Sequence, residues 1–177
     1  MSQAKRILIY GVTGSGKSTL GRRISDITGI PYTEADSLTW EPNWVQVSKE
    51  IQRERITELC ACDEWVLDSA YGTWKDIVFP RADLIVGLDY PRWISLSRLL
   101  RRTVARVRDR KLVCNGNVET LRQALSRDSI LLWHFRSFKR KRAQIRAWQS
   151  EFGERRVIVF KHPQEAEAWL ATLPHRQ

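Results

Sequence analysis

The sequence predicts an α/β fold in which a parallel sheet of five strands is covered by helices on both faces. Three observations support this prediction. Short apolar segments alternate along the chain with longer segments of helical periodicity. A glycine-rich loop joins the first strand to the first helix, and acidic residues follow several of the strands. In a parallel sheet, such features meet at the carboxyl ends of the strands, where ligands bind.

The expected strands are short segments bounded by polar or turn-forming residues: 7–10, 31–35, 65–68, 84–89 and 157–160. All except the second are apolar at nearly every position, without alternation. This pattern is typical of strands buried on both faces, as in a parallel sheet between two layers of helices.

Helical periodicity is present in residues 17–28, 48–62, 93–108, 119–151 (one or two helices) and 163–173. In the first helix Leu20 and Ile24 lie on one face, and Gly29 is a stop signal. Ser48 caps the second helix, and Pro91 opens the third. A polar break over residues 109–118 separates the third helix from the next helical region.

Residues 11–18 form a G-x-x-x-x-G-K-[ST] motif between the first strand and the first helix. Its glycines allow positive φ angles and bring backbone N–H groups close to an anion. Lys17 would reach the β- and γ-phosphates of a nucleotide, and the Ser18 hydroxyl would bind Mg²⁺. The N-terminus of the helix would direct further N–H groups at the same phosphates. We predict a site for ATP and Mg²⁺ formed by Gly11, Thr13, Gly14, Ser15, Gly16, Lys17, Ser18 and Thr19.

Acidic residues near the strand ends are candidates for organising the metal. Asp68 ends an apolar strand and is the better candidate, whereas Asp89 either does the same or begins the turn before Pro91. Glu34 and Asp36 lie two residues apart after the second strand. One could orient Mg²⁺ through water, and the other could accept a proton from a substrate hydroxyl, unless both are solvated loop acids. We assign the acceptor side to Asp36 and leave Glu34 as a possible metal residue.

The composition is that of a globular protein of one domain, residues 1–177, in which 42% of residues are hydrophobic and 28% charged. No apolar run approaches the roughly 18 residues of a membrane span. The N-terminus enters a strand without an apolar leader segment, so we expect a cytoplasmic protein with no membrane partner. Cys60 and Cys62 point to different faces of a helix, and the three histidines are scattered, which argues against a zinc site.

The net charge of +10 is concentrated in one stretch of chain. Residues 92–156 contain 18 lysines and arginines against 5 acidic residues, whereas the remainder contains 12 against 15. Such a stretch handles a polyanion, either nucleotide phosphates or nucleic acid. We expect the basic run 139–142 to be a solvated helix face. The expected core positions nearby are Leu131, Leu132, Phe135 and Phe138.

Three further segments carry a resemblance: residues 36–44 (DSLTWEPNW), 65–71 (WVLDSAY) and 89–93 (DYPRW). With the phosphate loop, and in this order, they resemble a widespread bacterial group of small P-loop kinases related to adenylate kinase. That group is labelled "adenylate kinase and related kinases" or "DNA topology modulation protein". Residues 115–120 and 126–133 resemble one of its branches, so the likeness covers nearly the whole chain.

The resemblance implies a P-loop NTPase fold of the nucleoside-monophosphate-kinase type, with strand order 2-3-1-4-5 and an arginine-rich helical lid over about residues 104–122. It implies that Asp68 holds Mg²⁺ and that Arg98 and Arg102 touch ATP. Arg122, on the helix that leaves the lid, would meet the transferred phosphate.

The E-x-D pattern at residues 34–36 is similar to the paired acids of shikimate kinases, with Glu replacing the first Asp. Between the second and third strands the chain departs from true adenylate kinases, which bind AMP there with a T-S-G-type turn and an arginine. This chain instead carries Trp40, Trp44 and a helix with Arg53 and Arg55. We therefore expect an acceptor other than AMP, a small hydroxylated or phosphorylated molecule.

The sequence thus predicts ATP-dependent phosphoryl transfer to a small molecule. Lid arginines can place planar donors on the phosphoryl group and exclude water. The predicted catalytic residues are Lys17, Asp36, Asp68, Arg102 and Arg122. The alternative is a nucleotide-dependent nucleic-acid-binding protein that regulates DNA topology through the basic stretch. No helix-turn-helix or RNA-recognition motif is visible, so we expect only weak, non-specific nucleic-acid binding.

Overall fold

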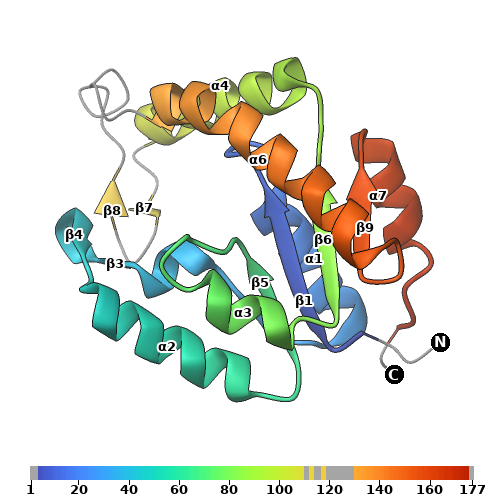
Figure 1. The fold of residues 1–177 in the computed structure, drawn as a ribbon. Helices are drawn as coiled ribbons and strands as arrows, with labels where there is room; N and C mark the ends of the chain where they lie inside the picture. The colour runs from blue at the N-terminus through green and yellow to red at the C-terminus, as the bar shows by residue number, and fades with distance from the viewer. Residues whose placement is uncertain (1–3, 110–111, 114–116, 119–129, 176–177) are drawn as a thin grey trace.

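The computed structural model describes residues 4–109, 112–113, 117–118 and 130–175. Its centre is a parallel sheet of five strands, shown in Figure 1. These are β1 (Arg6–Gly11), β2 (Tyr32–Thr33), β5 (Trp65–Asp68), β6 (Leu84–Leu88) and β9 (Val157–Phe160). Their spatial order is β2-β5-β1-β6-β9, and every pairing is parallel. Counted along the chain, this is the order 2-3-1-4-5, so the predicted fold class and topology are confirmed.

Helices cover both faces of the sheet. They are α1 (Lys17–Thr28), α2 (Lys49–Ala61), α3 (Lys75–Arg81), α4 (Arg92–Asp109), α6 (Ile130–Phe152) and α7 (Pro163–Leu170). Alternate residues of β1 point to opposite faces. Leu8 and Tyr10 join a core with α2, α3 and α6. Ile7 and Ile9 join a second core with α1, α4 and α7. The sheet is therefore buried on both sides, as the unbroken apolar strands predict.

Local signals set the start of α2 and the end of α1. The side chain of Ser48 accepts a hydrogen bond from the Ile51 N–H at 3.3 Å and so caps α2. Gly29 ends α1 in a left-handed conformation, with φ of 71°. α7 ends at Leu170, before the predicted end at residue 173. No helix within the described ranges combines the length and the apolar character that crossing a bilayer requires.

Three short features were not predicted. One is α3, a seven-residue helix that contains Pro80. The others are two hairpins of two-residue strands, β3 (Trp40–Glu41) with β4 (Val45–Gln46), and β7 (Leu112–Val113) with β8 (Asn117–Val118). Strands of two residues show no periodicity in the sequence. β2 is likewise shorter than its predicted range. Residues 119–129 of the fourth helical region lie outside the described part of the chain.

The inward face of α6 differs from the predicted one. Of the four expected core positions, Phe138 is buried, but Leu132 and Phe135 are 41% and 47% exposed. The residues that face the sheet and α4 are instead His134, Ser137, Phe138, Ile145 and Trp148. They lie three, four or seven residues apart along the helix, and such positions share one helix face. The prediction from apolar content failed for Leu132 and Phe135, because the polar residues His134 and Ser137 occupy the buried face of the helix.

Candidate functional site

The loop between β1 and α1 has the geometry of an anion-binding loop. Gly14 and Gly16 have φ angles of 82° and 96°, which residues with a side chain rarely adopt. A Cβ atom on Gly14 would lie 2.3 Å from the backbone oxygen of Ser95, so α4 packs directly on the loop. Gly16 caps α1, and the first N–H groups of this helix face the loop without a side-chain cap. These groups are suited to phosphate oxygens.

Lys17 is the first residue of α1, and its side chain points back into this loop. Its Nζ donates a hydrogen bond to the backbone oxygen of Val12 at 3.2 Å. Burial lowers the pKa of Lys17, while the negative charges of Asp68 and Asp36 act in the opposite direction. The lysine that the motif assigns to the phosphates is thus desolvated and directed into the loop.

Asp68 ends β5 directly beside the loop. Its Oδ2 accepts hydrogen bonds from the Ser18 hydroxyl at 2.5 Å and the Tyr32 hydroxyl at 2.8 Å. Its Oδ1 accepts one from the Ala35 N–H at 2.9 Å. The Ser18 hydroxyl and the Asp68 carboxylate thus place oxygen ligands side by side, and oxygen ligands are the kind that Mg²⁺ prefers. The next residue, Ser69, has φ of 126°, a strained backbone of the kind found at functional sites.

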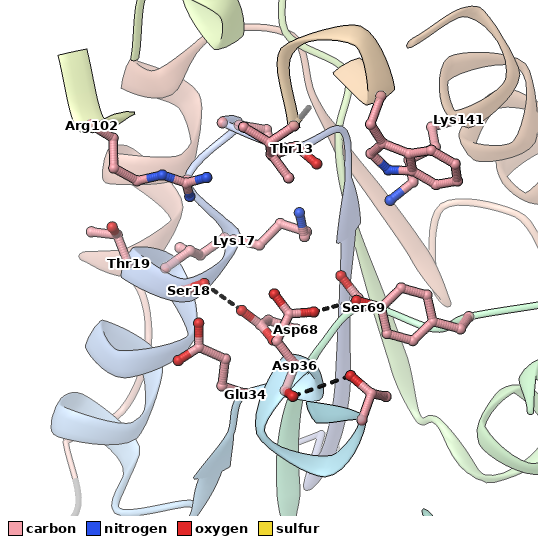
Figure 2. Close-up of a pocket in the computed structure, with 18 of the residues that line it drawn as sticks. Thr13, Lys17, Ser18, Thr19, Glu34, Asp36, Asp68, Ser69, Arg102 and Lys141 are labelled. Atoms are coloured by element: carbon pink, nitrogen blue, oxygen red, sulfur yellow. Dashed lines mark hydrogen bonds between the residues drawn. The ribbon is translucent and has the colours of Figure 1, made fainter. Parts of the chain in front are cut away.

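A cavity of about 1250 Å³ opens at the carboxyl ends of the strands. Figure 2 shows Lys17 and Asp68 inside it, with Arg102 and Lys141 approaching from opposite sides. Nearly all of the predicted nucleotide-binding residues line it: Thr13, Gly14, Ser15, Gly16, Lys17, Ser18, Thr19, Arg98 and Arg102. Gly11 does not line the cavity but begins the loop.

The second acidic position, Asp36, lies across the cavity from the loop, on a 3-10 turn at Ala35–Leu38. The Tyr71 hydroxyl donates a short hydrogen bond to its carboxylate. Glu34 also lines the cavity and forms an ion pair with Arg22 at 3.4 Å. The two acids therefore differ: Asp36 is oriented by a neutral hydroxyl, and Glu34 by a cation.

Two tryptophans of the β3–β4 hairpin form the aromatic wall of this side. The rings of Trp40 and Trp44 meet edge to face with centroids 5.9 Å apart, and both line the cavity. Arg55 holds the hairpin through an ion pair with Glu41 at 2.7 Å. Arg53 pairs with α3 instead. Neither arginine lines the cavity, so both support the wall from behind.

Of the three arginines that the resemblance implies, the structure describes two, Arg98 and Arg102. Arg98 donates to the backbone oxygen of Ser15 at 3.3 Å, and its guanidinium lies 5.8 Å from the centre of the Tyr90 ring. Arg102 lies one turn further along α4 and also faces the cavity. Arg122 lies outside the described residues, as do residues 110–111, 114–116 and 119–121 of the predicted lid.

One expectation about charged residues was wrong, and Asp89 has partners that the sequence did not predict. The run 139–142 is not a solvated face as a whole, because Lys141 donates to the backbone oxygen of Gly11 at 3.2 Å and lines the cavity. Arg142 forms an ion pair with Asp89, whose side chain is 1% exposed. Asp89 also accepts a hydrogen bond from Arg146 Nε at 3.1 Å. Asp89 therefore anchors α6 at the end of β6, and the segment that leads through Pro91 into α4 begins at this residue.

Sequence reasoning missed Lys141, Tyr71 and Tyr32 as parts of the site. A signal for Lys141 is present in the sequence: it lies three residues after Phe138 and four before Ile145, on the buried face of α6. The tyrosines carry no such signal, because their contacts with Asp36 and Asp68 join different elements of the fold.

Comparison with known proteins identifies the fold. No protein-family model matches the chain. A gluconokinase from Sinorhizobium meliloti 1021 superposes with a TM-score of 0.53 and 22% identity, over 94% of this chain and 91% of the other. A shikimate kinase from Bacteroides thetaiotaomicron does so with 0.54 and 14%, over 96% of each chain. A shikimate kinase from Aquifex aeolicus has a TM-score of 0.51 and 16% identity, over 94% of each chain.

At the sequence level, a shikimate kinase from Caulobacter vibrioides is 43% identical over 35 residues. This match spans 20% of the present chain and 18% of that enzyme. At these identities and coverages the comparisons show the fold, which is that of small P-loop kinases. The relation to the DNA topology modulation group remains a prediction.

Proposed function

We propose that the protein is an ATP-dependent kinase that transfers the γ-phosphoryl group to a hydroxyl of a small molecule. One observation carries the proposal: the phosphate loop with Lys17, Ser18 and Asp68 faces Asp36 across a single cavity. A nucleotide bound at the loop would therefore present its terminal phosphate to an acceptor lying beside Asp36.

On the nucleotide side, the loop N–H groups and Lys17 would bind the β- and γ-phosphates. The residues that would hold Mg²⁺ are Ser18 and Asp68, and the metal would neutralise charge on the phosphates. Arg98 and Arg102 approach from α4, where planar donors can bind phosphate oxygens. Transfer of a phosphoryl group depends mainly on such positioning and charge stabilisation.

On the acceptor side, Asp36 would accept the proton of the attacking hydroxyl, and Tyr71 holds its carboxylate in place. The wall of Trp40 and Trp44 offers flat apolar surfaces beside polar groups. This combination suits a small ring or chain that carries several hydroxyls. Since a gluconokinase and shikimate kinases share the fold, hydroxylated acids of these kinds are the first acceptors to screen.

The test is ADP formation in the presence of candidate acceptors, with the wild type compared with Lys17→Ala. We expect Lys17→Ala to lower turnover by at least about a hundredfold while the protein remains folded. Lys139→Ala, an exposed lysine of α6, is the matched control and should leave turnover unchanged. Equal turnover in the wild type and a folded Lys17→Ala variant would remove the kinase proposal.

A further inference from the structure

A second lysine enters the phosphate site from a distant part of the chain. Lys141 lies on α6, yet its Nζ is 3.2 Å from the backbone oxygen of Gly11, the first residue of the loop. The same ammonium lies 5.2 Å from the centre of the Tyr10 ring. Figure 2 shows Lys141 directed into the cavity from the side opposite to Arg102, with Lys17 between them.

The two ammonium groups share the site without a carboxylate in ion-pair contact. Among the described residues, neither Lys17 nor Lys141 has a carboxylate oxygen within 4.0 Å. The groups that act on Lys141 are Lys17, Asp36, Lys75 and Arg140, of which only Asp36 is negative. Burial and the charge of Lys17 lower the pKa of Lys141 to about 7. Such an arrangement is costly unless an anion binds between the cations.

The position of Lys141 is set by its neighbours on α6. Arg142 and Arg146 both bind Asp89 at the end of β6. A Cβ atom on Gly87 would lie only 2.6 Å from Ile145, so no side chain fits there and Ile145 of α6 packs directly on the backbone of β6. These contacts lie within about one turn of Lys141 and hold its side chain toward the loop.

We propose that Lys141 binds the γ-phosphoryl group of ATP together with Lys17. This inference rests on the proposed function. An ammonium has three N–H donors, and the described structure uses one of them, for Gly11. The remaining two are available for oxygens of the phosphates that Lys17 would bind. Of these phosphates we assign the terminal one to Lys141, because Asp36 on the acceptor side also acts on this lysine.

The proposal distinguishes a triphosphate from a diphosphate. ADP lacks the group that Lys141 would contact, so Lys141 should matter for ATP and hardly for ADP. The difference should also depend on pH, because the ammonium is charged below its pKa. In the wild type, the preference for the triphosphate should be largest below about pH 7 and decline as the pH rises above it.

The experiment is calorimetric titration of the full chain with Mg²⁺ and either ADP or the ATP analogue with an imido group between its β- and γ-phosphates. We expect Lys141→Ala to weaken analogue binding about ten- to a hundredfold, and ADP binding by less than about threefold. Lys141→Arg should retain the preference for the analogue and lose its decline above about pH 7, since arginine stays charged. Lys139→Ala is the control and should match the wild type for both ligands.

Several results would overturn the inference. An equal loss of ADP and analogue affinity would make Lys141 a support of the loop only. Unchanged analogue affinity, with or without an effect on the acceptor, would place Lys141 outside the γ-phosphate site. If the wild type bound neither nucleotide, the proposed function itself would fail, which this design separates from failure of the role of Lys141.

Discussion

Arg142 of α6 forms an ion pair with Asp89, a carboxylate that is buried at the end of β6, 53 positions earlier in the chain. Arg146, one turn later, binds the other carboxylate oxygen at 3.1 Å. The pairing attaches the longest described helix to the sheet beside the phosphate loop. It also places the neighbouring Lys141 at that loop.

The first prediction concerns this anchor. Asp89→Asn should lower the free energy of unfolding by about 1–3 kcal/mol, because two arginines lose a buried carboxylate. It should also weaken binding of the triphosphate analogue, since Lys141 would no longer be held. Urea unfolding and calorimetry measure the two effects. Asp76→Asn, which breaks the exposed pair with Arg53, should change neither. Unchanged stability of Asp89→Asn would show that the anchor is dispensable.

The second prediction tests the loop backbone. Gly14→Ala combines a φ of 82° with a Cβ atom 2.3 Å from the Ser95 oxygen. It should lower the free energy of unfolding by about 1–3 kcal/mol and abolish detectable ADP binding. Gly153→Ala has a similar φ, 71°, but no neighbour within 4 Å, so it isolates the backbone strain. Equal effects of the two variants on stability, with nucleotide binding retained, would contradict close packing of α4 on the loop.

The third prediction concerns the acceptor side. Asp36→Asn should lower turnover with the true acceptor by about a hundredfold or more, because it removes the proton acceptor. Tyr71→Phe should have a smaller effect, about tenfold, because it removes only the orienting hydrogen bond. Affinity for the ATP analogue should be nearly unchanged in both, as measured by calorimetry. If that affinity collapsed in Asp36→Asn, Asp36 would belong to the metal site.

The fourth prediction follows from the low pKa of Lys141, about 7 instead of the ordinary 10.5. Between these values the unfolded chain binds more protons at this residue than the folded protein does. The destabilisation that the buried lysine causes therefore decreases as the pH rises. Without nucleotide, Lys141→Met should therefore melt at a higher temperature than the wild type at about pH 6, and this advantage should shrink toward pH 10. Lys139→Met is the control. A variant less stable at every pH would show that the Gly11 hydrogen bond outweighs the buried charge.

The fifth prediction addresses the basic stretch 92–156. Several of its cations are engaged within the protein, through Asp89, the loop or the cavity. We therefore expect weak, sequence-independent binding to duplex DNA, falling with salt by a log–log slope of about −0.9 per phosphate contacted. Neutralising the exposed Lys139 and Arg155 should reduce this binding at low salt and leave ATP turnover intact. Fluorescence anisotropy at about 50 and 150 mM salt measures it, and a nanomolar, sequence-specific complex at the higher salt would favour the nucleic-acid hypothesis.

Much of the fold could be predicted because its signals are local. The ranges of β5, β9 and α1 agree with the predicted 65–68, 157–160 and 17–28. Apolar runs, helical periodicity and stop signals such as Gly29 all act within a few residues. Of the unpredicted elements, α3 is short and contains a proline, and the hairpin strands are only two residues long.

For the site, the sequence by itself determined the phosphate loop, because its chemistry lies in consecutive backbone groups and one lysine. It also placed Asp36 and Asp68 at the sheet edge, since parallel strands end together. Only the tertiary structure decided which side chains converge there from elsewhere. Asp89 anchors α6, and Lys141 lines the cavity, because one face of α6 packs toward β6 and β1. The orientation of α6 depends on contacts between residues that are 53 and 130 positions apart, and no local pattern in the sequence records such contacts.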